Sequence, residues 1–350
     1  MAEKKLKVGV IGTGMGRYHM EAFYEMPDVE LIVVCDLNLP EATYFAEKWG
    51  AKIVVDDYRK LVKLEELDAI SIATPNYLHA PMTIDFLNAG KHVLCEKPMA
   101  TTWQDAQAMV DAAKLNNRRL MIEQSQRFQK DTQVLKWYAD QGEFGRIYFV
   151  RTSWIRRKGT PVLNFEKGGS MGRGDWFLYK EQAGGGALYD IGVHFIDLAW
   201  YLMGQPKPVA VSGLHFLEVA RPGLRLKALP EEVDDFASAL IRFENGAAIE
   251  CTISWDCHQD SDSGLRLYGN KAGASLFPAF IYRGNTVMEK IELKVPTGGL
   301  PLTTPYRHFI DCIRDPEKQM IASGEEIVTI VRILNAIQES AEKGKEVTLV

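Results

Sequence analysis

Two stretches of the sequence carry side chains that could move a proton during a redox reaction. Lys97 follows the apolar run His92–Cys95 and directly precedes Pro98, whose ring fixes the local backbone. Asp190 and His194 are four residues apart, so a helix would place both on one face. Histidine exchanges a proton near neutral pH, and a cationic cofactor beside a lysine disfavours the ammonium form. This combination is typical of an oxidoreductase that uses a nicotinamide cofactor on an alcohol or ketone.

Each of these side chains also has a structural interpretation. A lone lysine usually lies on the solvated surface, although proline and the preceding strand favour a fixed position for Lys97. An aspartate–histidine pair can cap a helix or bind a metal ion. No third ligand with a recognisable spacing follows, so we predict no metal site. The preceding glycines, Gly184–Gly186, would let a ligand or another domain come close to the start of the helix.

The first 125 residues alternate strand and helix signals, which predicts a doubly wound α/β sheet of the Rossmann type. Near-continuous apolar runs suit strands that are buried on both faces of a parallel sheet. We expect strands at Leu6–Ile11, Leu31–Cys35, Lys52–Val55, Ala69–Ala73, His92–Cys95 and Leu120–Ile122, and helices at Tyr18–Met26, Pro40–Trp49, Ala80–Asn88 and Trp103–Leu115.

After residue 125 the rhythm changes to short alternating runs, which are typical of an antiparallel sheet with helices on one side. Asn245–Gly246 lies between two such runs and predicts a hairpin. A helix is expected at Ala187–Met203, because Gly204 and Pro206 follow it. Further helices are expected at Thr132–Asp140, Tyr306–Arg314 and Glu325–Glu342, and a strand at Ile147–Trp154.

A glycine-rich turn, Gly12–Gly16, follows the first expected strand. Its backbone could approach a pyrophosphate at the N-terminus of the next helix. The usual spacing would put the third glycine where Arg17 stands, so we expect a loop that is one residue shorter. The alternative is a plain strand-to-helix turn, but the alternating strands and helices around it favour a cofactor loop.

Two further strand ends have polar residues that suit a dinucleotide. Asp36 ends the second expected strand, where a carboxylate can bind the adenosine ribose hydroxyls and would repel a 2′-phosphate, so NAD is favoured over NADP. Asp36 could instead cap the following helix, a role for which Asn38 competes. Thr74–Asn76 ends the fourth strand, and we favour contact with the cofactor there over a simple turn.

The sequence resembles the Gfo/Idh/MocA family, which includes glucose–fructose oxidoreductase and inositol dehydrogenase. The resemblance rests on Glu96–Pro98, Gly12–Gly16, Thr74–Asn76 and, most specifically, Gly184–His194. It implies a Rossmann domain over residues 1–125, followed by an α+β domain over residues 126–350 with a large open, mostly antiparallel sheet. The second domain would bind substrate and form a homodimer or homotetramer through that sheet, and the C-terminal helix could pack back on the first domain.

The resemblance also implies roles for individual residues. Lys97, Asp190 and His194 would be catalytic, with His194 taking the hydroxyl proton and Lys97 assisting as hydrogen-bond donor and acid/base partner. The cofactor-binding set would be Gly12, Thr13, Gly14, Met15, Gly16, Arg17, Asp36, Thr74, Pro75, Asn76, His79, Glu96 and Lys97. The substrate-binding set would be Lys97, Arg127, Trp154, Arg156, Trp176, Asp190 and His194. Aromatic faces suit sugars and arginines suit hydroxyls or acids, but tryptophans are equally often core residues.

Composition narrows the class of protein. The net charge of −5 disfavours a nucleic-acid binder, and we see no signal peptide and no apolar run long enough to span a membrane. Five scattered cysteines without zinc spacing suggest a reduced, cytoplasmic protein. We therefore expect an NAD-dependent dehydrogenase of a sugar, inositol or related cyclic polyol. The alternatives are a redox-neutral hydride-shuttle enzyme of the lyase or glycosidase type and a non-catalytic NAD-binding sensor.

Overall fold

The computed structural model describes residues 4–161, 174–219, 233–284 and 286–349. The chain divides into two compact units. The first unit consists of Met1–Gln124 and Thr303–Val328, and the second of Ser125–Leu302 and Thr329–Val350.

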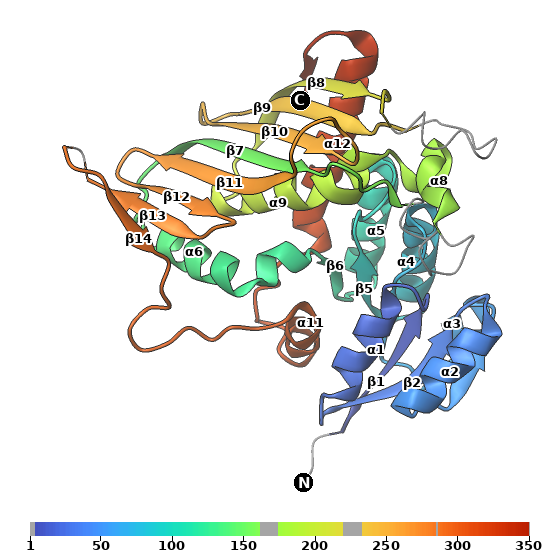
Figure 1. Cartoon of the computed structure of the whole chain (residues 1–350). Helices are drawn as coiled ribbons and strands as arrows, with labels where there is room; N and C mark the ends of the chain where they lie inside the picture. Colours follow the sequence, from blue (N-terminus) through green and yellow to red (C-terminus); the bar gives the residue numbers. More distant parts are fainter. Residues whose placement is uncertain (1–3, 162–173, 220–232, 285, 350) are drawn as a thin grey trace. The chain divides into compact units, whose positions relative to one another are not determined.

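The first unit contains a six-stranded parallel sheet with the order β3-β2-β1-β4-β5-β6, as predicted for a Rossmann fold (Figure 1). The central strands are buried apolar runs, because helices cover both faces of such a sheet. The strands are β1 (Leu6–Ile11), β2 (Val29–Cys35), β3 (Ile53–Val55), β4 (Ala69–Ile72), β5 (His92–Glu96) and β6 (Leu120–Glu123).

Two of the helices between these strands begin at side-chain caps. Asn38 caps α2 by accepting a hydrogen bond from the Glu41 backbone N–H, and Thr102 caps α5 in the same way at Asp105. The helices are α1 (Gly16–Tyr24), α2 (Leu39–Trp49), α3 (Arg59–Val62), η1 (Asn76–Leu78), α4 (His79–Asn88), α5 (Trp103–Leu115) and α11 (Pro305–Arg314).

The second unit is built on a nine-stranded, mostly antiparallel sheet with the order β14-β13-β12-β11-β7-β10-β9-β8-β15. Only β7 and β10 pair in parallel, and the predicted hairpin at Asn245–Gly246 joins the antiparallel pair β9 and β10. The strands are β7 (Ile147–Ile155), β8 (Pro208–Phe216), β9 (Phe236–Phe243), β10 (Ala248–Ser254), β11 (Asp262–Gly269), β12 (Gly273–Leu276), β13 (Phe280–Arg283), β14 (Glu289–Glu292) and β15 (Val347–Thr348).

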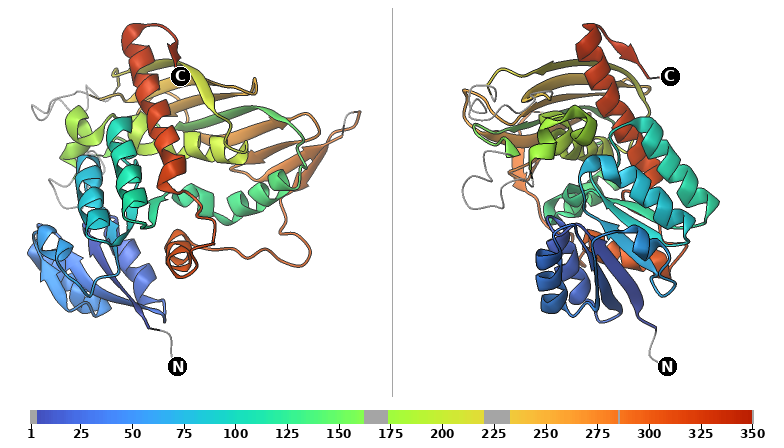
Figure 2. Two further views of the ribbon diagram at one scale, coloured as in Figure 1. Left: turned by 180° about the vertical axis from the view of Figure 1, so that it is seen from behind. Right: turned by 90° about the vertical axis from the view of Figure 1, so that its right-hand side faces the viewer.

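Helix α9 (Val193–Leu202) packs on this sheet along β7, β10 and β11 (Figure 1). Most of its residues are buried, as expected for a helix between a sheet and other helices. The later turns of α12 (Gly324–Lys343) pack on β8, where the Ser340 hydroxyl accepts the Gly213 N–H (Figure 2). The remaining helices are η2 (Ser125–Phe128), α6 (Lys130–Asp140), η3 (Asp175–Leu178), α8 (Lys180–Ala183) and η4 (Leu188–Gly192).

The helix expected at Ala187–Met203 is interrupted: η4 is a π-helical turn, and regular α-helix begins only at Val193. The buried Asp234 carboxylate accepts the N–H groups of Gly186 and Leu188, at 2.8 and 2.9 Å. A Cβ on Gly186 would lie 1.8 Å from the Asp234 carbonyl oxygen, so only glycine allows this approach. The glycine at position 186 therefore allows the backbone of Asp234, a residue of the same unit, to lie directly against it. Such widened turns are common at functional sites.

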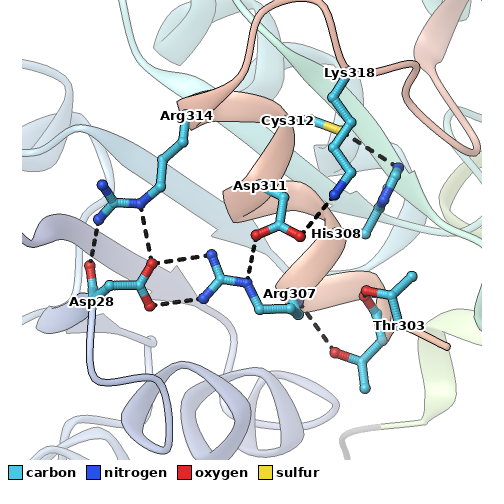
Figure 3. Close-up of polar contacts among 9 residues, drawn as sticks. Asp28, Thr303, Arg307, His308, Asp311, Cys312, Arg314 and Lys318 are labelled. Carbon is cyan, nitrogen blue, oxygen red and sulfur yellow. Dashed lines mark hydrogen bonds and ion pairs between the residues drawn. The ribbon is translucent and has the colours of Figure 1, made fainter. Parts of the chain in front are cut away.

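Within the first unit, α11 is attached by a network of charged side chains (Figure 3). Asp28 lies between Arg307 and Arg314 and receives hydrogen bonds or ion pairs of 2.7–3.1 Å from both. The hydrogen bond from Arg307 lowers the Asp28 pKa by more than partial burial raises it, so this pKa lies below its usual value. Asp311 in turn binds Arg307 and Lys318, at 2.8 and 2.9 Å. The network holds α11 to the start of β2.

His308 on α11 makes the stability of this attachment depend on pH. Its Nε2 accepts the Ile321 N–H at 2.9 Å, so that nitrogen must be unprotonated. Burial, assisted by the charge of Lys318, lowers the His308 pKa from 6.5 to about 4. The unfolded chain therefore binds a proton between these values and the folded chain does not. Stability should be intact above pH 6.5 and should fall as the pH decreases toward about 4.

We expect His308→Gln to remove part of this acid sensitivity, because a glutamine oxygen can accept the same N–H without titrating. The contribution of His308 is at most on the order of 3 kcal/mol. Urea unfolding of both proteins at neutral pH and near pH 5 measures it. The variant should lose less stability than the parent on acidification, and equal losses would show that His308 does not matter. Desolvation also lowers the pKa of the buried His79 and of the half-buried His92, so acid sensitivity should remain in the variant.

Candidate active site

The three glycines of the first loop have three different structural tasks. Gly12 has φ +89°, and a Cβ there would lie 2.3 Å from the Ala73 carbonyl oxygen. Gly14 has no protein atom within 4 Å of the position of its Cβ, so its backbone is open to a ligand. A Cβ on Gly16 would lie 2.9 Å from the Val10 side chain, so Gly16 packs the helix against β1. The glycine that comes one residue early thus provides the close packing that a pyrophosphate-binding turn requires.

Asp36 is already part of this loop. One carboxylate oxygen accepts both the N–H and the hydroxyl of Thr13, each at 2.7 Å. The other accepts the Asn38 N–H at 2.8 Å. Asn38, and not Asp36, caps the following helix.

The structure brings the carboxyl ends of β1, β2, β4 and β5 together. Ala73 lies against Gly12, and the buried His79 imidazole joins two loops. Its Nδ1 lies 2.8 Å from the Pro98 carbonyl oxygen and its Nε2 lies 2.9 Å from that of Thr74. Thr74 and Pro75 are half-buried, and Asn76 is buried at the start of η1. On the glycine loop, Met15 and Arg17 are exposed.

Lys97 is half-buried at the end of β5, and Glu96 before it is buried. The Glu96 carboxylate accepts the Lys97 N–H at 3.1 Å and lies 3.0 Å from the Nε2 of His19. Our sequence analysis did not identify His19 or its second partner, Ser71, whose hydroxyl lies 2.7 Å from Nδ1. The sequence did contain a signal for this contact, because Ser71 is a polar residue within the otherwise apolar strand Ala69–Ile72.

In the second unit, Asp190 lies among residues from three elements. The buried Trp255 indole N–H donates to Asp190 Oδ2 at 3.0 Å, and an Arg156 guanidinium nitrogen lies 3.9 Å from the same oxygen. The side chain of Asp190 is 14% exposed and that of Arg156 is 31% exposed, so solvent and a ligand can reach both. Sequence analysis did not identify Trp255, because a tryptophan at the end of an apolar strand is equally typical of a core.

His194 joins the same cluster through Trp154. Their ring centroids are 6.1 Å apart, and Trp154 also contacts Phe195 at 5.0 Å. The Arg156 guanidinium lies over the Trp154 ring at 4.7 Å, in cation–π geometry. Trp154 therefore contacts both a cation and the buried His194.

Trp176 and Arg127 differ in their surroundings. Trp176, in η3, is half-buried and stacks on Phe177, which packs against the core cluster containing Trp255. Arg127 is fully buried, and its guanidinium donates to both Asp197 oxygens at 2.8 and 2.7 Å. It also lies 4.5 Å from the Tyr201 ring. This geometry suits the attachment of α9, the helix that carries His194, better than direct contact with a ligand.

The two units thus offer complementary chemistry. The first has a glycine loop whose Gly14 is open to a ligand, a strand-end carboxylate and a lysine, which fit a dinucleotide. The second has a carboxylate, a histidine, an arginine and aromatic faces, which fit a hydroxylated ring. Within the described residues, no three His, Cys, Asp or Glu side chains are grouped so that they could hold a metal ion.

Known proteins resemble both units. Residues 6–124 match the model of an oxidoreductase family with an NAD-binding Rossmann fold, GFO_IDH_MocA, and residues 132–275 match the GFO/IDH/MocA C-terminal domain. D-glucoside 3-dehydrogenase from Escherichia coli K12 is 32% identical over 360 aligned residues, which cover 100% of this chain and 99% of that protein.

Two solved structures have the same fold over nearly the whole chain. Levoglucosan dehydrogenase in complex with NADH and levoglucosan has a TM-score of 0.82 and 25% identity, covering 99% of each chain. Aldose–aldose oxidoreductase from Caulobacter crescentus has a TM-score of 0.81 and 25% identity, covering 99% of this chain and 100% of that one. None of the helices in the described parts of the chain is both long and apolar enough for a membrane span.

Proposed function

Because the chain belongs to the Gfo/Idh/MocA family of oxidoreductases with an NAD-binding Rossmann fold, we propose that it oxidises a secondary hydroxyl of a sugar or related cyclic polyol. The observation that carries the proposal is the cluster of Asp190, His194, Trp154 and Arg156 on the second unit. A pyranose ring offers apolar C–H faces for an aromatic ring and hydroxyls for charged groups. The glucoside and anhydrosugar named for two relatives support this substrate class.

The first unit would bind the cofactor through the residues at its strand ends. Gly12–Gly16 would place backbone N–H groups against the pyrophosphate, and Asp36 would accept ribose hydroxyls. Thr74–Asn76 and Lys97 stand at the neighbouring strand ends. When bound, the nicotinamide ring supplies the acceptor for a hydride.

Proton transfer is assigned to three side chains. His194 would take the proton of the reacting hydroxyl, since an imidazole can accept one near neutral pH. Asp190, held by the Trp255 N–H, would bind a hydroxyl and orient the substrate. Lys97 would donate a hydrogen bond to the reacting oxygen and act as acid/base partner. Trp154, Arg156 and Trp176 would contact the ring and its substituents, while Arg127 would act through Asp197 to hold α9.

Asp36 is expected to select NAD over NADP. We expect Asp36→Ser to lower the ratio of NAD affinity to NADP affinity by roughly tenfold or more, since it removes a charge that repels the 2′-phosphate. NAD itself should also bind more weakly, because Asp36 orders Thr13 and Asn38. Calorimetric titration with each cofactor measures both effects without a substrate. An unchanged ratio would exclude Asp36 as the selecting residue.

A redox-neutral hydride shuttle is the second candidate, because one structural relative is named an aldose–aldose oxidoreductase. Such an enzyme would convert one sugar without accumulating NADH.

We also propose that residues 1–125 form the cofactor domain and residues 126–350 the substrate domain. The open sheet would mediate a homodimer or homotetramer, and the free cysteines support a cytoplasmic location.

The proposal is tested by incubating the protein with NAD and, separately, a panel of glucosides, anhydrosugars, aldoses, inositols and sugar acids, while NADH absorbance is followed. A dehydrogenase should form NADH with one class of the panel. Conversion of sugar without NADH would favour the hydride shuttle. Binding of NAD with no conversion of any sugar would contradict both and favour a sensor.

A further inference from the structure

The carboxyl end of β5 is anchored by a buried chain of hydrogen-bonding groups. Ser71 Oγ lies 2.7 Å from His19 Nδ1, and His19 Nε2 lies 3.0 Å from Glu96 Oε1. The other Glu96 oxygen accepts the Lys97 N–H at 3.1 Å. These groups come from α1, β4 and β5, and Ser71 and His19 are fully buried. The chain ends at the backbone of Lys97, the residue to which the proposed function assigns a hydrogen bond to the reacting oxygen.

The direction of these hydrogen bonds follows from the charge of Glu96. Burial alone would raise the Glu96 pKa, but the hydrogen bond from His19 and the charge of Lys97 outweigh it, and the pKa lies below its usual value. An ionised carboxylate only accepts, so His19 Nε2 must carry a proton. The Ser71 hydroxyl can serve Nδ1 as donor or as acceptor. The Lys97 N–H completes the set by donating to the second oxygen.

Serine, histidine and glutamate in a row could suggest a nucleophile with its base. The geometry is unsuitable for that chemistry. Ser71 lies in the middle of the parallel sheet, opposite Val10 of β1 and Leu94 of β5, with no exposed surface. No substrate atom can reach its hydroxyl, so the row of groups holds a position and does not attack a bond.

The backbone around Lys97 is held on both sides. Before it, Glu96 is fixed by His19; after it, the Pro98 carbonyl oxygen lies 2.8 Å from His79 Nδ1. The Tyr306 ring of α11 packs against the His19 imidazole, with the two ring centroids 4.9 Å apart. A lysine has a long flexible side chain, so a fixed backbone limits the volume that its ammonium group explores.

We infer that His19 is a positioning residue for Lys97, acting through the Glu96 carboxylate and braced by Ser71 and Tyr306. This inference rests on the proposed function for the role of Lys97, but the geometry that it describes lies wholly within the first unit. Removing the N–H of His19 should release the Glu96 carboxylate, and with it the Lys97 backbone, without touching the substrate or the cofactor loop.

The test compares His19→Leu, His19→Gln and His92→Gln. His19→Leu removes the donor and should lower kcat by roughly 10- to 100-fold, with less effect on the affinity for NAD. It should also move the acidic limb of the pH–rate profile upward, because Glu96 loses the contact that keeps it ionised. His19→Gln can place an amide N–H near the position of Nε2 and should restore much of kcat. His92 is a half-buried histidine at the opposite end of β5, and its replacement should leave kcat and the pH profile unchanged.

A second readout does not need turnover. After reductive ¹³C-methylation, the NMR signal of Lys97, assigned with Lys97→Arg, should shift and broaden in His19→Leu and remain unchanged in His92→Gln. If the parent protein turns over no sugar, the proposed function fails, and this signal still tests the positioning. The inference is overturned if folded His19→Leu keeps the parent's Lys97 signal, or if it keeps the parent's kcat and pH profile.

Discussion

Replacing His194 with asparagine, or Lys97 with methionine, is expected to lower kcat by roughly 10³-fold while both variants still bind NAD, the His194 variant with nearly the parent's affinity. A positioned acid or base contributes on the order of 10²- to 10⁴-fold to proton transfer, and each variant removes the only titratable atoms of its side chain. His194 belongs to the second unit, whereas the Gly12–Gly16 loop and Asp36 belong to the first. Steady-state kinetics and calorimetric titration with NAD measure the two quantities.

His92→Gln is a suitable control for the histidine variant, because it also removes an imidazole that is partly shielded from solvent but lies at the start of β5. It should keep the parent's kcat, with some loss of stability. If His194→Asn and Lys97→Met both retained full activity, the assignment of these residues to proton transfer would be wrong. A loss of NAD affinity equal to the loss of kcat would point to misfolding or cofactor binding.

The second large effect is expected at the buried pair of Arg127 and Asp197. Arg127→Met should lower the free energy of unfolding by about 3–5 kcal/mol, because it leaves the Asp197 carboxylate buried without its partner. Both side chains have zero exposure, and two hydrogen bonds of 2.7 and 2.8 Å join them. Urea denaturation followed by circular dichroism measures the change.

Two further variants separate the charge from the packing. The double variant Arg127→Met with Asp197→Leu removes both charges and should recover much of the lost stability. Lys180→Ala breaks an exposed ion pair with Glu342 and should cost less than about 1 kcal/mol. A loss of stability for Arg127→Met no larger than that for Lys180→Ala would contradict the account. So would a double variant that is less stable than Arg127→Met alone.

The strands and the longer helices of the first unit were predictable because their signals are local, whereas the short helices α3 and η1 were not predicted. Each buried strand is a near-continuous apolar run, and the longer helices begin near a strand end with a turn or capping residue. The glycine loop was predicted in place. The role of Gly16 in packing was not predicted, because it depends on how closely the Val10 side chain approaches the Gly16 backbone in the fold.

The features that sequence analysis missed depend on contacts between distant segments. The π-helical turn at Leu188–Gly192 accompanies a contact with Asp234, which lies far along the chain. His19 is one of several polar residues in its helix, and only the fold brings Ser71 and Glu96 to it. The resemblance placed Arg127 near the substrate, but its burial against Asp197, 70 residues away, is visible only in the folded unit.

Transfer of a labelled hydride tests the central claim most directly. The protein would be incubated with NAD, [4,4-²H₂]NADH and each sugar of the panel, and the recovered sugar would be analysed by mass spectrometry. We predict that one sugar class gains a single deuterium on carbon, because NAD oxidises the hydroxyl and the labelled cofactor reduces the product again, and that His194→Asn abolishes the gain. No deuterium in any sugar, with NAD binding demonstrated on the same sample, would contradict the account.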